Sequence, residues 1–167
     1  PLPERGKLHF TLDAIEMAQA ADLIQENVPE DLSIKRSALA PVAEATGSDV
    51  IIATSTSGFM PSEIQEGLRH PERFLVGPPF NPVYLCPLVE IVGGKETSDE
   101  AKAAAKEFYL SIGMHALMVK RDVPGHISDR LQEAMWREIP HAPRHHIAPP
   151  GPVDDNNLYA PAPGPSV

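Results

Sequence analysis

Short apolar runs rich in β-branched residues are the feature of this chain that most restricts its fold. The run at 50–53, Val-Ile-Ile-Ala, is continuous rather than alternating, which is typical of a strand buried on both faces. Similar runs occupy residues 74–77, 88–92 and 116–119. Because segments with helical spacing separate several of these runs, the sequence predicts an α/β domain with a mainly parallel sheet.

The remaining elements follow from caps, periodicity and proline positions. Ser98 resembles an N-cap that opens a helix ending near Gly113, and Pro41 is expected to kink a helix at 31–46. Pro140 is expected to end the last helix, which starts near Ile127. Further helices are predicted at 14–21 and 61–68, and further strands at 8–11 and 21–26.

Composition limits the classes of function. The 167 residues carry a net charge of −9 with no basic run, so nucleic acid is not an expected partner. A single cysteine excludes an internal disulfide, and the sequence shows neither a secretory signal nor an apolar run of membrane-spanning length. These features predict a cytoplasmic protein without a membrane partner.

Polar residues follow two of the apolar runs and interrupt a third. Thr54-Ser55-Thr56-Ser57-Gly58 comes directly after one run, and Pro78-Pro79-Phe80-Asn81-Pro82 follows the next. Glu90 stands inside the third run, where an isolated carboxylate would be costly and therefore needs a partner. Polar groups at the ends of neighbouring strands are typical of an active site.

These motifs resemble the NAD-dependent 3-hydroxyacyl-CoA dehydrogenase family, and within it most closely the carnitine 3-dehydrogenase branch. The resemblance extends from about Leu8 to Ile139 and includes STSG, NPVYLxPLVEIVGG and DRLxEAxWRE. It implies that 1–123 is the second half of a Rossmann-type NAD-binding domain and that 124–139 begins a helical domain. No G-x-G-x-x-G occurs in the sequence, so the first half of the nucleotide domain is expected to lie upstream of Pro1.

The last 28 residues, 140–167, differ from the rest of the sequence. They contain eight of the nineteen prolines and no apolar period, which predicts a disordered tail. Its three histidines have no cysteines or clustered carboxylates around them, so no metal site is predicted.

The resemblance also implies cofactor contacts. Glu30 and Lys35 match positions that face the nicotinamide side of NAD, Ser57 matches a serine shared by cofactor and substrate, and Asn81 matches another cofactor contact. Each also has a structural explanation, namely a helix first turn, a solvated lysine, a turn serine and a loop asparagine. The matching spacing of all four favours the functional interpretation.

The family oxidises a 3-hydroxy group, with a histidine base oriented by a carboxylate. Ser57, Glu90 and Asp129 match its catalytic positions, but Pro78 stands where the histidine is expected. The other histidines, His126 among them, lie outside the motif positions and are interpreted as exposed or incidental.

Two further features leave alternatives open. Asp129 occupies a site that is Asn in the acyl-CoA branch, which is compatible with a different substrate or with a simple helix N-cap. Tyr84 and Trp136 could face a trimethylammonium group, although core packing is the favoured interpretation.

The sequence thus predicts an oxidoreductase of carnitine or fatty acid metabolism that uses NAD. The expected substrate is carnitine, with 3-hydroxyacyl-CoA or L-gulonate as alternatives, and the family is expected to be homodimeric. Impaired activity is expected, because Pro78 lacks a proton acceptor and because the first half of the NAD domain and most of the C-terminal helical domain are expected to be missing. The rival hypothesis is a non-catalytic fragment or pseudoenzyme.

Overall fold

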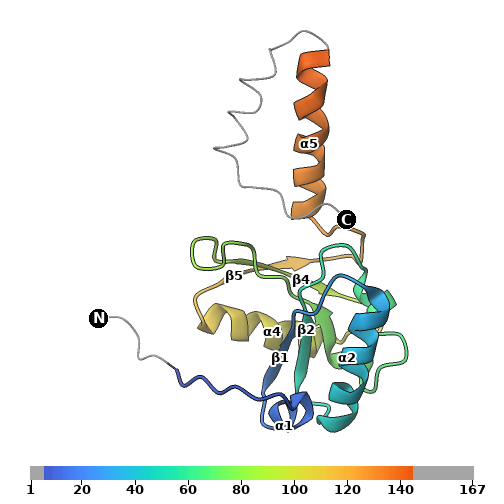
Figure 1. Cartoon of the computed structure of the whole chain (residues 1–167), viewed down its shortest axis with the longest axis vertical. Helices are drawn as coiled ribbons and strands as arrows, with labels where there is room; N and C mark the ends of the chain where they lie inside the picture. The colour runs from blue at the N-terminus through green and yellow to red at the C-terminus, as the bar shows by residue number, and fades with distance from the viewer. Residues whose placement is uncertain (1–5, 145–167) are drawn as a thin grey trace.

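A five-stranded sheet forms the centre of the protein in the computed structural model, which describes residues 6–144 (Figure 1). The strand order is β1-β2-β3-β4-β5, and every neighbouring pair is parallel except β3 with β4. The predicted α/β fold with a mainly parallel sheet is therefore confirmed. The strands are β1 (Leu23–Glu26), β2 (Ile51–Thr54), β3 (Phe74–Val76), β4 (Leu88–Gly93) and β5 (His115–Val119).

The helices begin where short polar side chains satisfy free backbone amides. Asp13 accepts from Ile15 and Glu16 and starts α1, Asp31 accepts from Ile34, and Ser98 accepts from Ala101, as its position predicted. The helices are α1 (Ala14–Gln19), α2 (Leu32–Ala45), α3 (Pro61–Ile64), the 3-10 helix η1 (Pro71–Arg73), α4 (Asp99–Ser111) and α5 (Ser128–Arg144).

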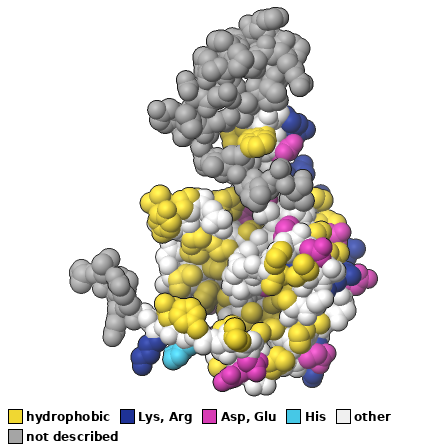
Figure 2. Space-filling model, viewed as in Figure 1, with side chains coloured by type: hydrophobic (Ala, Val, Ile, Leu, Met, Phe, Trp, Pro, Cys, Tyr) yellow, Lys and Arg dark blue, Asp and Glu magenta, His cyan; other side chains and the backbone are white. Residues whose placement is uncertain are grey.

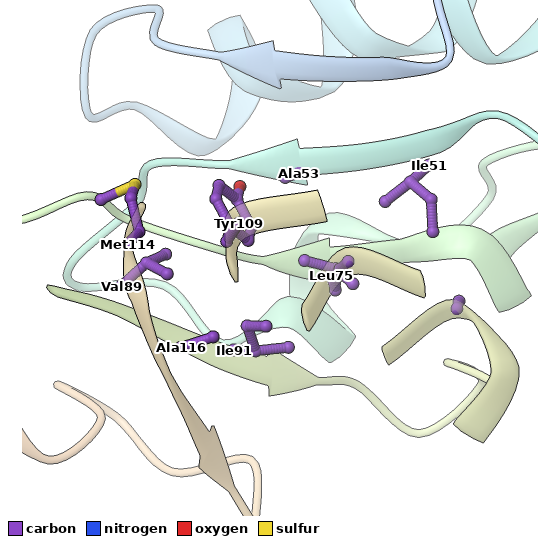
Figure 3. Close-up of a cluster of buried hydrophobic side chains, with 10 residues drawn as sticks. Ile51, Ala53, Leu75, Val89, Ile91, Tyr109, Met114 and Ala116 are labelled. Atoms are coloured by element: carbon purple, nitrogen blue, oxygen red, sulfur yellow. The ribbon is translucent and has the colours of Figure 1, made fainter. Parts of the chain in front are cut away.

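Helices cover both faces of the sheet and bury its alternating side chains. One face packs against α4, and Ile91 of β4 and Tyr109 of α4 belong to the cluster buried between them (Figure 3). The other face packs against α1, α2 and α3 and includes Ile52 and Phe74. Since Glu90 alternates with Val89 and Ile91 along β4, its side chain belongs to this second face.

Three predicted elements differ from the structure. Residues 8–11 form no strand, and Leu8 and Phe10 are exposed, because no described strand lies beside them to pair with. Helix α3 ends at Ile64 rather than near Leu68, since Gly67 adopts a left-handed φ of 79° that a helix cannot continue through.

Pro140 does not end the last helix, which continues to Arg144. A proline removes one hydrogen bond of the helix, and α2 accommodates Pro41 in its interior in the same manner. The tail predicted to start at residue 140 is thus helical at its beginning, and its remainder, 145–167, lies outside the described residues.

Helix α5 projects away from the sheet (Figure 1). Its Trp136 is half-exposed and Tyr84 in the loop before β4 is 85% exposed, so the core-packing interpretation of both aromatic residues is wrong.

Hydrophobic side chains gather over much of the face seen in Figure 2. Within residues 6–144, no helix is both long and apolar enough to cross a membrane.

Candidate functional site

The candidate site lies where β1, β2 and β3 end at one edge of the sheet. Parallel strands place their carboxyl ends together, so the loops after Glu26, Thr54 and Val76 meet there. The first residues of β4 lie at the same edge, because β4 runs antiparallel to β3. The loop that leads into α5 returns to this edge through contacts with Glu90.

Lys35 and two glutamates form a hydrogen-bonded charge cluster beneath the site. The Lys35 ammonium is buried and lies 3.2 Å from both carboxylate oxygens of Glu26 and 3.2 Å from Oε2 of Glu30. It also donates to the Val28 carbonyl at 3.3 Å. All three of its donor directions are therefore used by this chain, which leaves Lys35 placed to orient Glu30 rather than to reach a ligand.

Three groups of the chain contact the Glu30 carboxylate, although its side chain remains partly exposed. The Thr56 hydroxyl and the Gly58 amide both donate to Oε1, the amide at 3.0 Å. Burial alone would raise the pKa of Glu30, but these two hydrogen bonds and the Lys35 charge together lower it. Glu30 is therefore a fixed, ionised acceptor at the edge of the site.

Ser57 and Asn81, the other predicted cofactor contacts, are both exposed at this edge. Ser57 follows β2, and its hydroxyl is near enough to the Asp129 carboxyl to lower the pKa of that group. Asn81 lies in the loop between β3 and β4. Glu30 and Ser57 can accept or donate hydrogen bonds to a carboxamide such as that of nicotinamide, so these residues fit the nicotinamide end of NAD.

Residue 78 stands opposite Glu90. Val76 pairs with Val92 and Pro79 bridges Val89, and this antiparallel register brings Pro78 directly across from Glu90. Directly opposed residues have Cβ atoms about 5 Å apart on one face of the sheet. The cyclic side chain of Pro78 offers no nitrogen or oxygen to the carboxylate.

Glu90 finds its partners elsewhere, at the start of α5. Its carboxylate is buried and accepts from the amides of Ile127 at 3.2 Å and Ser128 at 3.0 Å, and from the Ser128 hydroxyl at 2.7 Å. The sequence correctly required a partner for this carboxylate, but residue 78 is not that partner. A negative charge at a helix N-terminus is also favoured by the helix dipole.

Asp129 lies in the first turn of α5 and is not its N-cap, since the helix already starts at Ser128. Burial raises the pKa of the Asp129 carboxyl, and the negative charges of Glu90 and Glu30 raise it further. The neighbouring His126 and the Ser57 hydroxyl offset part of this rise in pKa. The helix thus carries a carboxyl group that is harder to ionise than an exposed aspartate.

His126 is a residue of this corner that the sequence interpretation dismissed. It is buried, not exposed, and its Nε2 lies 3.4 Å from the Thr56 carbonyl. Its Nδ1 has no hydrogen-bond partner among the described residues, and its φ of 46° is left-handed. The only signal in the sequence was its position after Gly125, just before a helix that begins at the site.

Helices on both faces of a mainly parallel sheet, with polar loops at the strands' carboxyl ends, define a Rossmann-type nucleotide-binding domain. Within residues 6–144, no group of three or more His, Cys, Asp or Glu side chains could hold a metal ion.

Comparison with known proteins gives the family. Residues 4–123 match the family described as 3-hydroxyacyl-CoA dehydrogenase, NAD binding domain, and the chain belongs to this family. It is 49% identical over 155 residues to the L-carnitine dehydrogenase of Pseudomonas putida, covering 93% of this chain and 48% of that protein. It is 48% identical to the Bacillus cereus enzyme of the same name, with 94% and 48% covered. The chain thus spans about half the length of these relatives.

Solved structures agree with this assignment. An FHMPC 5-dehydrogenase, described as an NAD+ dependent dismutase, superimposes with a TM-score of 0.86 at 31% identity, over 95% of this chain and 52% of that one. The 3-hydroxybutyryl-CoA dehydrogenase of Escherichia coli gives a TM-score of 0.77 at 30% identity, over 83% and 29% of the two chains. NAD is accordingly the cofactor of the domain family to which residues 4–123 belong.

Proposed function

We propose that this chain provides the nicotinamide half of an NAD-dependent 3-hydroxy dehydrogenase whose substrate is carnitine or a similar trimethylammonium compound. The observation that carries the proposal is the register that sets residue 78 opposite Glu90, beside Ser57 and Asp129. NAD, when bound, accepts the hydride from the carbinol carbon. A cytoplasmic location, predicted from the sequence, belongs to the same proposal, as does a homodimer for the family but not necessarily for this chain alone.

The charges of the site support a substrate with a cationic group. Glu30 and Glu90 add negative charge near Asp129, and this charge raises the pKa of Asp129. The Lys35 ammonium is buried against Glu26 and Glu30 and is not available to a ligand. A trimethylammonium group is attracted to such a corner, whereas the phosphates of coenzyme A are repelled.

In this proposal the residues of the chain have separate roles. Glu30 and Asn81 bind the nicotinamide end of the cofactor, and Lys35 keeps Glu30 ionised and in place. Ser57 positions the substrate hydroxyl. Pro78 slows the reaction, because a positioned base typically contributes about 10² to 10⁴ in rate.

The test compares Pro78 with Pro78→His in a protein that joins this chain to the remaining parts of the dehydrogenase, with NAD reduction by L-carnitine as the readout. We expect the variant to be at least about a hundredfold faster, because Glu90 lies opposite the new imidazole and can orient it. Glu90→Gln should then slow the Pro78→His protein much more than it slows the parent chain. Equal rates with and without Pro78→His would show that the base does not lie at position 78.

Pro78 favours one rival, a domain that binds NAD without catalysis. In that case Pro78→His and the parent chain would both bind NAD, and neither would reduce it with carnitine, 3-hydroxybutyryl-CoA or L-gulonate. Activity with 3-hydroxybutyryl-CoA or L-gulonate but not with carnitine would retain the class and change the substrate.

A further inference from the structure

Three strand ends and helix α4 meet in a hydrogen-bonded network on the face of the sheet that α4 covers. Gln25 of β1 belongs to this face, because it alternates along the strand with Ile24, which packs on the other face. Its side chain bonds to Ser55 after β2, to Gly77 after β3 and to Tyr109 of α4. The network thus joins segments that lie up to 84 residues apart in the sequence.

Each polar atom of the Gln25 amide has a defined partner. Oε1 accepts from the Tyr109 hydroxyl at 2.5 Å, and Nε2 donates to Ser55 Oγ at 2.9 Å and to the Gly77 carbonyl at 3.2 Å. A side-chain amide has two N–H donors, so both of them are used. Tyr109 is 2% exposed, and burial raises the pKa of its hydroxyl, which therefore keeps the proton that it donates. The network thus fixes the orientation of the Gln25 amide.

Gly77 receives this network immediately before residue 78. Its carbonyl accepts from Gln25 and lies 3.4 Å from the Tyr109 hydroxyl, and its amide donates to the Thr54 carbonyl at 2.9 Å. Both polar groups of Gly77 are therefore bound, whereas Pro78 has no amide hydrogen with which to hold itself in place. The position of residue 78 consequently depends on the bonds that Gly77 makes.

The Tyr109 ring also determines toward which face residue 78 points. A Cβ atom on Gly77 would lie 2.7 Å from the Tyr109 hydroxyl oxygen and 3.3 Å from Cζ, so the side-chain position of residue 77 faces α4. Successive side chains of an extended segment point to opposite faces, and the β-bridge made by Pro79 keeps this segment in the sheet. Residue 78 therefore points to the other face, which is the face of Glu90.

We propose that Tyr109 and Gln25 are positioning residues that hold residue 78 opposite Glu90. The assignment rests on the function proposed above, in which the base belongs at position 78. Tyr109 is buried and acts through the Gln25 amide and the Gly77 carbonyl. A displacement of about 1 Å caused by a change far from the reacting atoms can cost about a hundredfold in rate, so such a network contributes to a reaction from outside the site.

The first test needs no turnover. In the 167-residue chain, Pro78→His places an imidazole opposite the Glu90 carboxylate, whose charge should raise the imidazole pKa above the ordinary value of about 6.5. NMR titration of the ring protons measures this pKa. Adding Tyr109→Phe or Gln25→Met should lower it by about half a unit or more, because the ring then moves away from the carboxylate. Tyr84→Phe removes the same hydroxyl from an exposed side chain and should leave the pKa unchanged.

Glu90→Gln in the same Pro78→His chain provides the reference, and it should lower the imidazole pKa by about one unit or more. If Glu90→Gln lowers this pKa but neither Tyr109→Phe nor Gln25→Met does, the positioning role is wrong. If Glu90→Gln leaves the pKa unchanged, residue 78 does not face Glu90 and the role is wrong as well. A merely structural role would reduce stability without lowering the pKa, and two network variants keep the test valid if one folds poorly.

The second test uses the protein that joins this chain to the remaining parts of the dehydrogenase and carries Pro78→His, with L-carnitine as substrate. Tyr109→Phe should lower kcat by about tenfold to a hundredfold with KM for NAD unchanged. The acid limb of the pH profile should move to lower pH, because a base of lower pKa loses its proton at lower pH. An unchanged kcat and an unchanged limb would overturn the role. If the protein reduces NAD with no hydroxy substrate but the NMR shifts are as expected, the network still holds residue 78 and the proposed function is wrong.

Discussion

Two buried polar clusters lie at the same edge of the sheet and are built in opposite ways. In the first, Lys35 bridges Glu26 and Glu30, and hydroxyls from Thr54 and Thr56 complete the hydrogen bonds of the two carboxylates. In the second, Glu90 is bound by α5, but the Nδ1 of His126 has no partner among residues 6–144. Asp129 there is surrounded mainly by negative charge.

This difference in hydrogen bonding indicates which of the two clusters supports the fold and which is available to a ligand. A buried network whose donors and acceptors are all used is rigid and has little left to offer a ligand. A cluster with an unpaired nitrogen and a carboxyl of raised pKa is typical of groups that exchange protons. We infer that the Lys35 cluster holds the loops in place and that the corner of Glu90, His126 and Asp129 is the part of the site with polar groups left to contact a ligand.

The largest expected effect tests the scaffold. Lys35→Met leaves Glu26 buried without its counter-ion, and breaking a buried pair in this way costs about 3 to 5 kcal/mol of unfolding free energy. Urea denaturation followed by circular dichroism would measure the loss. Arg69→Met is the control, because its pair with Glu44 is exposed and such pairs contribute about 0 to 1 kcal/mol. Equal losses of unfolding free energy in Lys35→Met and Arg69→Met would show that the Lys35 cluster does not stabilise the fold more than an exposed ion pair does.

A smaller effect is expected at the contact between Glu90 and the first turn of α5. Glu90→Gln removes the charge that accepts from Ile127 and Ser128, so the first turn of α5 should open more easily, by about 1 to 2 kcal/mol. Hydrogen exchange of these two amides would report the change. Glu133→Gln, on the exposed part of the same helix, should leave them unaffected. Unchanged exchange in Glu90→Gln would mean that other contacts hold the start of α5.

The smallest expected effect concerns how folding stability depends on pH. The contributions of Glu30 and Asp129 to the free energy of unfolding should change in opposite directions as the pH rises. The pKa of Glu30 is lowered on folding, so its stabilising contribution is present above its unfolded pKa and is lost as pH falls through the folded pKa. The pKa of Asp129 is raised, so its contribution is fully present below the unfolded pKa and is lost as pH rises through the folded pKa. Both contributions to the free energy of unfolding should be small, since both carboxyl groups keep contact with water.

Denaturation of the parent chain, Glu30→Gln and Asp129→Asn between about pH 3 and 8 would measure these contributions. Relative to the parent, Glu30→Gln should be least stable near neutral pH, and Asp129→Asn should gain stability as pH rises. The same sign for both variants would contradict the assignment of the two clusters.

Local sequence determined most of the secondary structure. The continuous apolar runs became strands because β-branched side chains suit a sheet that is buried on both faces, and Asp13, Asp31 and Ser98 began helices through their own side chains. Local rules failed where a tertiary contact was needed. The run at 8–11 has no neighbouring strand among the described residues, and Pro140 did not outweigh the rest of its helix.

For the site, the sequence by itself determined that Glu90 needed a partner, and the tertiary structure decided which one. The requirement follows from burial in an apolar strand, which can be read from the neighbouring residues. The partner, at Ile127 and Ser128, lies 37 and 38 residues away. His126 was likewise hidden, because its burial and its unpaired nitrogen exist only once the loop before α5 folds back onto Thr56. Residue types reveal which groups are costly to bury, but only packing between distant segments determines which of them are satisfied.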